Sequence, residues 1–305
     1  MWEQLLTAIQ QGDQRALARA ISWVENEVDG YEELLKNLPA GHASITGITG
    51  PPGAGKSTLV DALIGEWVSA NKKVGVLCVD PSSPFNLGAV LGDRIRMSEW
   101  YNHPNVFIRS LATRGALGGL HPYIIEITAL LQSAGFDHII VETVGVGQSE
   151  IEIAGLADTT VVVVVPEAGD EVQTMKAGLM EIADIFVVNK SDRPDADRFV
   201  KNLRLMLAPA FHQKKEEIAI IKTVASTREG VSDLAAAITT HQGYMLDNDR
   251  KTLLLTEKAY RLIQKQKMKG IEKDRLKEAV QKERMNPDFN IYSFVQAFLK
   301  TATEN

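Results

Sequence analysis

A glycine-rich stretch, GPPGAGKS from Gly50 to Ser57, has the spacing G-x-x-x-x-G-K-[ST] of a phosphate-binding loop. A short β-branched run precedes it and an amphipathic run follows it, which is the strand-loop-helix context in which this motif binds phosphate. Glycines at Gly50, Gly53 and Gly55 permit backbone conformations that let amide N–H groups converge on phosphate oxygens. The helix that follows adds the positive end of its dipole. The sequence therefore predicts a bound nucleoside triphosphate.

The residues around these glycines supply the rest of the phosphate and cation chemistry. We expect Lys56 to contact the β- and γ-phosphates, Ser57 to bind Mg²⁺ and Thr58 to support the α-phosphate. Ala54 lies inside the loop, and its backbone belongs to the same cradle. Which base the triphosphate carries is indicated elsewhere in the chain.

The base is indicated by the segment VVNKSD, in which Asn189, Lys190 and Asp192 follow an apolar run that reads as a strand. This is the N-K-x-D pattern of GTPases. The Asp192 carboxylate can accept hydrogen bonds from both N1–H and the 2-amino group of guanine, whereas adenine lacks that pair of donors. The stem of Lys190 can lie along the plane of the base. Together with the phosphate-binding loop, the pattern predicts GTP and GDP as ligands.

A second strand end, in KTVASTREG, is where GTPases place a short backbone contact to O6 of guanine. Ala225 and its neighbours Val224 and Ser226 fit that position. The alternative is an ordinary turn between a strand and a helix.

Three carboxylates stand at or near predicted strand ends, where parallel α/β sheets gather their ligands. They are Asp80 in VGVLCVDPSSP, Asp93 in LGDRIRM and Glu142 in FDHIIVETVGVGQ. A carboxylate on the strand beside the phosphate-loop strand is the usual route to magnesium, directly or through water. ETVG is similar to the D-x-x-G of GTPases, so Gly145 could donate its N–H to the γ-phosphate. Capping or structural hydrogen bonds are the alternative for these carboxylates. We expect catalytic roles for Lys56, Asp80 and Glu142, and metal-binding roles for Ser57, Asp80, Asp93 and Glu142.

The position after Gly145 holds Val146, whereas Ras-like GTPases place there a Gln that orients the attacking water. Gln148 comes two residues later. Intrinsic hydrolysis should therefore be slow unless a partner completes the site, which favours a switch over a metabolic catalyst.

A glycine-rich loop, RSLATRGALGGLHP, carries Arg109 and Arg114 and could shape the site or a partner surface. Neither arginine is assigned as an arginine finger.

The elements that would position these residues are short β-branched runs that alternate with helical segments from residue 44 to about residue 241. Continuous apolar runs such as KVGVLCVD and TTVVVVV are typical of a parallel sheet covered on both faces. The alternation indicates right-handed crossovers and an α/β, doubly wound, mainly parallel sheet of the P-loop NTPase class. Helical segments flank this region, and Asp13 is expected to be the N-cap of the second one. The expected division is an N-terminal helical extension at 1–40, a P-loop GTPase domain at 41–248 and a C-terminal helical arm at 249–305.

Composition limits the classes of function. The chain has 305 residues, of which 45% are hydrophobic and 24% charged, a normal globular balance. The net charge of −6 argues against a nucleic-acid partner, since phosphate neutralisation needs a clustered basic surface. The only cysteine, Cys78, cannot form an intramolecular disulfide and reads as inert core. The N-terminus does not read as a signal peptide and the longest apolar run is too short to span a bilayer, so we expect a cytoplasmic protein without a membrane partner.

Several motifs coincide in this chain: GPPGAGKST, VDPSSP, GDRIRM, ETVGVGQSE, PEAGDEVQTMKAG and NKSD. Together they resemble the MeaB/ArgK-type (MMAA-like) G proteins, the methylmalonyl-CoA mutase-associated GTPases, over roughly residues 40 to 245. ETVGVGQSE and VDPSSP are not general features of P-loop proteins, so the set is specific. The resemblance implies a SIMIBI-class GTPase that hydrolyses GTP to GDP and phosphate. It also implies a chaperone that gates the loading of adenosylcobalamin onto an adenosylcobalamin-dependent acyl-CoA mutase and protects that mutase from inactivation.

The resemblance also assigns roles by position. Lys56 and Ser57 become the phosphate and magnesium residues, and Asp80, Asp93 and Glu142 the acidic magnesium and switch residues. The stretch Glu167 to Lys176 becomes an extra switch that relays the nucleotide state to the mutase, and the C-terminal arm becomes the contact of a homodimer. Two positions depart from the family pattern. Ser191 stands where Ala is common, which should be harmless, and Val224 stands where Ser is common, which leaves only the backbone contact of Ala225.

Two other functions stay open at this point. An older label of the same family, lysine/arginine/ornithine transport ATPase, favours a P-loop kinase or ATPase, which would bind ATP at least as tightly as GTP. A GTPase that delivers a metal to a maturing enzyme is the other alternative. Such proteins usually carry His- or Cys-rich tracts, whereas the six histidines of this chain are scattered.

Overall fold

The chain is described here by a computed structural model. It describes residues 2–80, 97–113, 120–143, 149–166, 177–211, 218–244, 249–268, 271, 273–286 and 288–302. The chain divides into two compact units, Met1–Thr252 and Leu253–Asn305, and each is described by itself.

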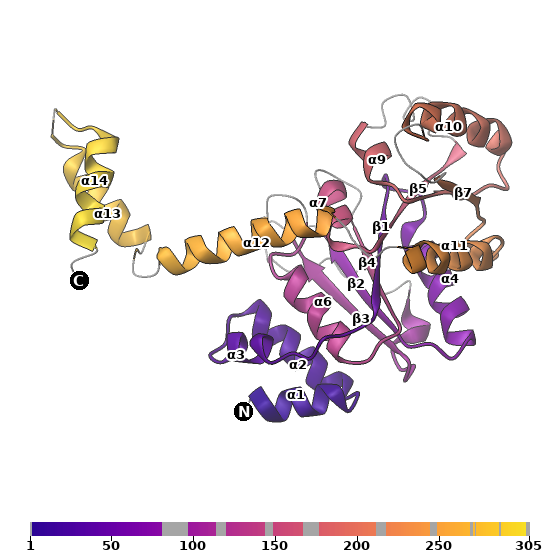
Figure 1. The fold of residues 1–305 in the computed structure, drawn as a ribbon, viewed down its shortest axis with the longest axis horizontal. Helices are drawn as coiled ribbons and strands as arrows, with labels where there is room; N and C mark the ends of the chain where they lie inside the picture. Colours follow the sequence, from indigo (N-terminus) through magenta and orange to yellow (C-terminus); the bar gives the residue numbers. More distant parts are fainter. Residues whose placement is uncertain are drawn as a thin grey trace. The chain divides into compact units, whose positions relative to one another are not determined.

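The first unit is built on a parallel β-sheet, which has seven strands among the described residues (Figure 1). Their order is β3-β2-β4-β1-β5-β6-β7, and every neighbouring pair runs parallel. The strands are β1 (Ser44–Thr49), β2 (Val74–Asp80), β3 (Val106–Ala112), β4 (His138–Glu142), β5 (Thr159–Val164), β6 (Ile185–Val188) and β7 (Ala219–Lys222). The expected doubly wound α/β fold is confirmed, because each apolar run that was read as a strand forms one.

Helices cover both faces of this sheet (Figure 1). The helices of the first unit are α1 (Trp2–Gln10), α2 (Gln14–Glu25), α3 (Tyr31–Lys36), α4 (Lys56–Ser69), η1 (Ser98–Trp100, a 3₁₀ helix), α6 (Ile124–Ser133), α7 (Ser149–Leu156), α9 (Ala177–Ile182), α10 (Ala196–Phe211) and α11 (Val231–Tyr244). Alternation along β5 shows the two faces: Val161 and Val163 belong to the core beneath α4 and α11, whereas Val162 and Val164 belong to the core beneath α9 and α10. Both cores are fully apolar at β5, which is why this strand reads as a continuous valine run.

The N-terminal helices pack as a group, in which α2 contacts α1, α3 and α6. Asp13 is the N-cap of α2, as expected, because its side chain accepts hydrogen bonds from the backbone N–H of Arg15 at 2.8 Å and of Ala16 at 3.1 Å. The apolar face of α2, including Leu17, Ile21 and Val24, is completely buried. These helices therefore belong to the first compact unit, Met1–Thr252.

The second unit is helical. It contains most of α12 (Asp249–Lys267), together with α13 (Lys273–Glu283) and α14 (Ile291–Ala302). Large apolar side chains on α12 are exposed, with exposed fractions of 65% for Leu253, 59% for Tyr260 and 57% for Ile263. In the part of the chain that the structure describes, no helix combines the length and the apolar character needed to cross a membrane.

Candidate nucleotide-binding site

The phosphate-binding loop leaves the end of β1 and enters α4, whose first residue is Lys56. Gly50 has a φ of +138°, and a Cβ at this position would stand 2.1 Å from the carbonyl oxygen of Val163. Gly55 has a φ of +89°, and its Cβ would stand 2.4 Å from Nδ2 of Asn189. Both glycines are therefore required by left-handed backbone and by close approach of neighbouring groups. The sharp bend that they permit brings the loop's backbone to the N-terminus of α4, where anions bind.

The Lys56 side chain is buried inside this loop. Its Nζ donates hydrogen bonds to the carbonyl oxygens of Gly50 at 2.9 Å and Pro51 at 3.1 Å. The ammonium group is thus held where it adds a full positive charge to the helix dipole at the same point. Thr58, one residue beyond Ser57, is exposed in the first turn of α4.

A serine and a carboxylate meet beside the loop. Ser57 Oγ donates a hydrogen bond to Glu142 Oε1 at 2.7 Å, and the two residues are only 6% and 4% exposed. Glu142 is the last residue of β4, which pairs directly with β1. The predicted carboxylate beside the phosphate-loop strand is therefore Glu142. Asp80 ends β2, which pairs with β4 and β3 and so lies one strand further from β1.

On the other side of the loop, the buried side chain of Asn189 links three segments. Its Nδ2 donates to the carbonyl oxygen of Ala54 in the phosphate-binding loop at 2.8 Å. Its Oδ1 accepts from Thr223 Oγ1 at 3.2 Å and from the backbone N–H of Ala225 at 3.1 Å. Asn189 therefore fixes the loop, the end of β6 and the strand end after β7 against one another. The sequence placed Asn189 at the site but gave no sign of this cross-linking role.

Lys190 and Asp192 follow directly. Lys190 has a left-handed φ of +56°, and its Nζ donates to the carbonyl oxygen of Gly53 at 2.8 Å. Its stem therefore crosses from the N-K-x-D segment to the phosphate-binding loop. Asp192 is exposed and lines a pocket of about 760 Å³ together with Val224, Lys201 and residues of β7. Its carboxylate is accessible to a base.

The strand end after β7 supplies the remaining predicted residues. Val224 and Ala225 are buried, at 7% and 5% exposure, and Ser226 is exposed. The N–H of Ala225, which the sequence assigned to O6 of guanine, donates to Asn189 in this structure. If this N–H also contacted O6 of guanine, it would donate to O6 and to Asn189 Oδ1 at the same time.

Some predicted residues lie outside the described part of the chain. These are Asp93, Arg114, Gly145, Val146, Gln148 and the stretch from Glu167 to Lys176. The described residues bring together Gly50, Gly53, Ala54, Gly55, Lys56, Ser57, Glu142, Asn189 and Lys190.

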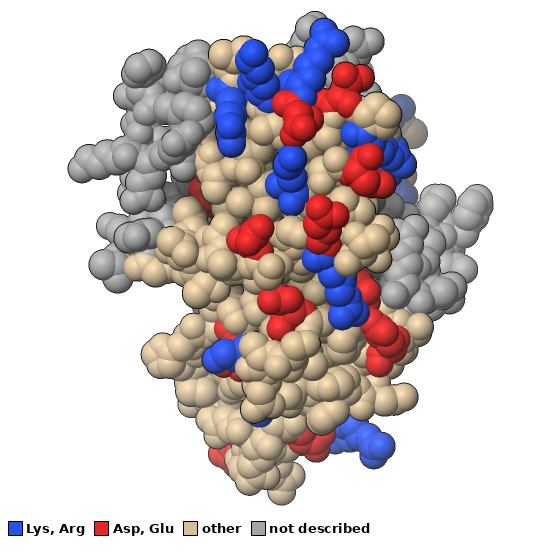
Figure 2. Space-filling view, turned by 90° about the vertical axis from the view of Figure 1, so that its right-hand side faces the viewer, with Lys and Arg blue, Asp and Glu red and all other residues tan. Residues whose placement is uncertain are grey.

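Around the pocket at Asp192, the surface is charged with both signs. Figure 2 shows that acidic and basic side chains are interspersed on the face that carries α4, α10 and α11. Lys222 and Asp197, which both line this pocket, form an ion pair in which Lys222 Nζ lies 2.9 Å from Asp197 Oδ1. The Lys222 ammonium lowers the pKa of the Asp197 carboxyl through a hydrogen bond and its charge.

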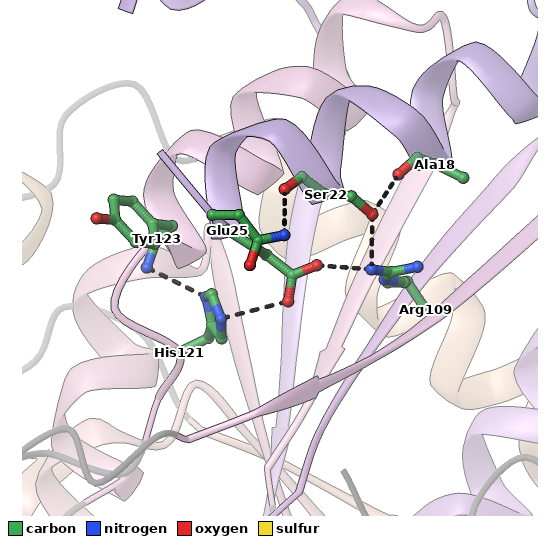
Figure 3. A network of polar contacts seen from close by, with 7 residues as sticks. Ala18, Ser22, Glu25, Arg109, His121 and Tyr123 are labelled. Carbon is green, nitrogen blue, oxygen red and sulfur yellow. Dashed lines mark hydrogen bonds and ion pairs between the residues drawn. The ribbon is translucent and has the colours of Figure 1, made fainter. Parts of the chain in front are cut away.

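Arg109 has a structural role. Figure 3 shows its guanidinium directed toward Ser22 and Glu25 of α2. Its Nη2 lies 2.6 Å from Glu25 Oε2 and donates to Ser22 Oγ at 3.2 Å. His121 Nε2 lies 3.6 Å from the other oxygen of the same carboxylate. These contacts fasten α2 to β3 and to the start of α6, so the suggestion that Arg109 shapes the nucleotide site directly is not supported.

Replacing Arg109 by Ala should lower the free energy of unfolding by about 2–3 kcal/mol, because it removes the cation that lies 2.6 Å from the carboxylate of Glu25, which is only 9% exposed. The rate of GTP hydrolysis by the folded fraction should change less than twofold. Chemical denaturation and a phosphate-release assay measure the two quantities. Arg19→Ala, an exposed position on the same helix, is the control and should be nearly neutral. A large loss of hydrolysis with unchanged stability would contradict the structural role.

Comparisons with known proteins show which family this chain is similar to. The family model for "Methylmalonyl Co-A mutase-associated GTPase MeaB" matches residues 17–284. A Pyrococcus horikoshii protein named as a GTPase is 48% identical over 255 residues, which cover 81% of this chain and 80% of that protein. The Caenorhabditis elegans protein named "Methylmalonic aciduria type A homolog, mitochondrial" is 39% identical over 207 residues, covering 62% of this chain and 52% of that protein.

Among solved structures, one titled "Crystal structure of LAO/AO transport system kinase" is similar with a TM-score of 0.65 and 24% identity. The match covers 99% of this chain and 97% of that chain. At this identity the likeness shows the fold alone.

Proposed function

Because the chain belongs to the MeaB family of methylmalonyl-CoA mutase-associated GTPases, we propose that it is a GTP-driven switch for an adenosylcobalamin-dependent acyl-CoA mutase. It gates the loading of adenosylcobalamin onto that mutase and protects the mutase from inactivation. The observation that carries the proposal is the meeting of the phosphate-binding loop, Glu142 and the Asn189–Asp192 segment in one site. The names of the family and of the nematode relative support a mutase as the partner.

The donors at the site fit magnesium. Ser57 and Glu142 present hydroxyl and carboxylate oxygens, the hard ligands that Mg²⁺ prefers. We propose that Ser57 holds the ion together with Glu142, Asp80 and Asp93. When bound, magnesium neutralises negative charge on the β- and γ-phosphates. The hydrogen bond that Ser57 donates to Glu142 would orient the serine oxygen that binds the cation.

Hydrolysis then follows from the residues of the loop. Water attacks the γ-phosphorus in line with the oxygen that bridges to the β-phosphate, and that bridging bond breaks. Lys56 and the loop's amide N–H groups stabilise the charge that develops on the phosphate oxygens. Gly145 donates its N–H to the γ-phosphate, and the loops containing residues 80–93, 142–148 and 167–176 change order with the nucleotide. The guanine base is held by Asp192, by the stem of Lys190 and by the backbone at Val224, Ala225 and Ser226.

The mutase partnership has a direct test. A purified methylmalonyl-CoA mutase should bind this protein with affinities that differ at least about fivefold between the GDP state and the state loaded with a non-hydrolysable GTP analogue. Biolayer interferometry with the mutase immobilised measures both. Equal binding in the two states would remove the mutase from the proposal. ATP binding as tight as GTP binding would favour the transport kinase or ATPase instead.

Hydrolysis should be slow without a partner, because Val146 occupies the position of the water-orienting Gln. We expect a turnover of about 0.01 s⁻¹ or less for the protein alone, in the range of GTPases that lack a completing partner. Addition of the mutase should raise it about tenfold or more. Phosphate release under single-turnover conditions measures both rates, and rapid turnover by the isolated protein would contradict the expectation.

We also propose that residues 1–40 are an N-terminal helical extension and that residues 41–248 are the GTPase domain. We propose that the protein is cytoplasmic. The C-terminal arm, residues 249–305, would form the contact of a homodimer. The exposed apolar side chains Leu253, Tyr260 and Ile263 support the dimer, since they recur at helical spacing on one side of α12. Light scattering of wild type and of Ile263→Glu tests it, and a monomeric wild type would reject it.

A further inference from the structure

Two residues that are poor choices for their own backbone meet where the loop after β7 lies against α4. Arg228, in that loop, has a left-handed φ of +64°, a conformation with a steric cost for any residue that carries a Cβ. Gly65 lies inside α4, where glycine destabilises a helix relative to alanine. Local choices of this kind are kept where the tertiary structure compensates for them, often at functional sites.

The compensation is a contact between these two residues. A Cβ at position 65 would stand 3.1 Å from Nη1 of Arg228, 3.2 Å from its Cζ and 3.3 Å from its Nη2. All three distances are shorter than ordinary van der Waals contact, so a side chain at position 65 would push the guanidinium away from the helix. Gly65 is buried, whereas the Arg228 side chain is 56% exposed. The arginine therefore packs over a stretch of α4 backbone that only glycine leaves open.

Charge contributes little to this contact. Arg228 Nη2 lies 3.8 Å from Glu99 Oε1, and both side chains are more than half exposed, so water screens the pair. The packing of the arginine stem and guanidinium on α4 is therefore what ties position 228 to the helix.

The backbone of Arg228 is in turn joined to the residues that we place against guanine. The N–H of Arg228 donates to the carbonyl oxygen of Ala225 at 3.3 Å, and the N–H of Thr227 donates to that of Val224 at 3.0 Å. The N–H of Val224 donates to the carbonyl oxygen of Glu229 at 3.0 Å, which closes the loop on itself. Fastening Arg228 to α4 therefore fastens the whole loop to the helix that begins at the phosphate-binding loop.

We infer that Arg228 is a positioning residue for guanine: its side chain, packed on Gly65, holds the N–H of Ala225 at the distance from the phosphate-binding loop that O6 of the base requires. This inference rests on the proposed function, in which that N–H donates to O6. A base without an oxygen at this position gains nothing from the placement of the N–H. Arg228 therefore acts on the choice of base, through the loop rather than on the ligand.

The test uses the full chain and nucleoside diphosphates that differ at position 6 of the purine. GDP and inosine diphosphate carry an oxygen there, whereas ADP carries an amino group. Arg228→Gly removes the side chain and suits the left-handed backbone, so the variant should fold. Asn71→Gly is the matched control, because Asn71 is also exposed and left-handed, with a φ of +58°, and lies just beyond the end of α4. Calorimetry measures the three dissociation constants, and thermal unfolding monitors the fold.

Arg228→Gly should weaken GDP and inosine diphosphate by the same factor, about five- to tenfold, and change ADP binding less than twofold, as expected for one misplaced hydrogen bond. Asn71→Gly should leave all three affinities within about twofold. Gly65→Leu displaces the guanidinium from the helix side and should reproduce the effect of Arg228→Gly. The double variant should be no worse than Arg228→Gly, because the side chain that Leu displaces is already absent.

An unchanged ratio of GDP to ADP affinity in Arg228→Gly would overturn the inference while leaving the proposed function intact. Equal weakening of all three nucleotides, or failure of the variant to fold, would also overturn it, since either result means a merely structural role. Additive losses in the double variant would show that the two residues act separately and would overturn the contact as the cause. If the wild-type protein bound ADP as tightly as GDP, the proposed function itself would fail.

Discussion

Asp192→Asn should weaken GTP and GDP binding by about 100- to 1,000-fold, since two charge-assisted hydrogen bonds to guanine are affected. The Asp192 carboxylate offers only acceptors, which match the N1–H and the 2-amino donors of the base. An asparagine offers one acceptor and one donor, so its NH₂ group opposes the 2-amino group of guanine. Xanthine carries a carbonyl oxygen at that position and keeps N1–H. The variant should therefore bind xanthosine triphosphate better than GTP.

Competition binding with a fluorescent GDP analogue against GTP, ATP and xanthosine triphosphate measures this change. Asp195→Asn is the matched control, because Asp195 is exposed in the same segment and its left-handed φ of +67° suits asparagine. It should leave all four affinities within about twofold. If Asp192→Asn bound GTP as tightly as wild type does, guanine recognition would have to be placed elsewhere and the transport kinase or ATPase would return.

The strands and the phosphate site could be predicted because their signals are local. A run such as TTVVVV in β5 is buried on both faces and shows this in its composition, and Gly50 to Ser57 carries its own spacing. The two motifs assigned both Ser57 and Glu142 to the metal site, and the structure brings them into contact because β4 lies beside β1 and ends at the same edge of the sheet.

Contacts between distant segments could not be predicted in the same way. Arg109 and Glu25 are 84 positions apart, and each alone looks like an ordinary charged residue. Arg109 was considered as a possible site residue because nothing in the sequence indicates that Glu25 is its partner. The role of Asn189 has the same origin. It depends on the strand order β3-β2-β4-β1-β5-β6-β7, which the alternation of strands and helices does not specify.

The carboxylate of Glu142 is the second point at which a small change should have a large effect. In Glu142→Gln the side chain keeps its size, but the charge that accepts the Ser57 hydrogen at 2.7 Å is lost. The amide can turn its NH₂ group toward Ser57, and the serine oxygen would then spend a lone pair on the amide instead of the cation. We expect turnover to fall about 100-fold and the Mg²⁺ concentration for half-maximal rate to rise about tenfold or more.

Binding of GDP in the presence of a chelator separates this effect from damage to the fold. That binding depends on Lys56, the loop amides and Asp192, so it should change less than about threefold in Glu142→Gln. Glu66→Gln is the control for the substitution itself, because Glu66 is exposed on the same helix as Ser57. An unaltered Mg²⁺ requirement in Glu142→Gln would show that this carboxylate only caps Ser57. The metal would then have to be held by Asp80 and Asp93, although Asp80 ends a strand one position further from β1.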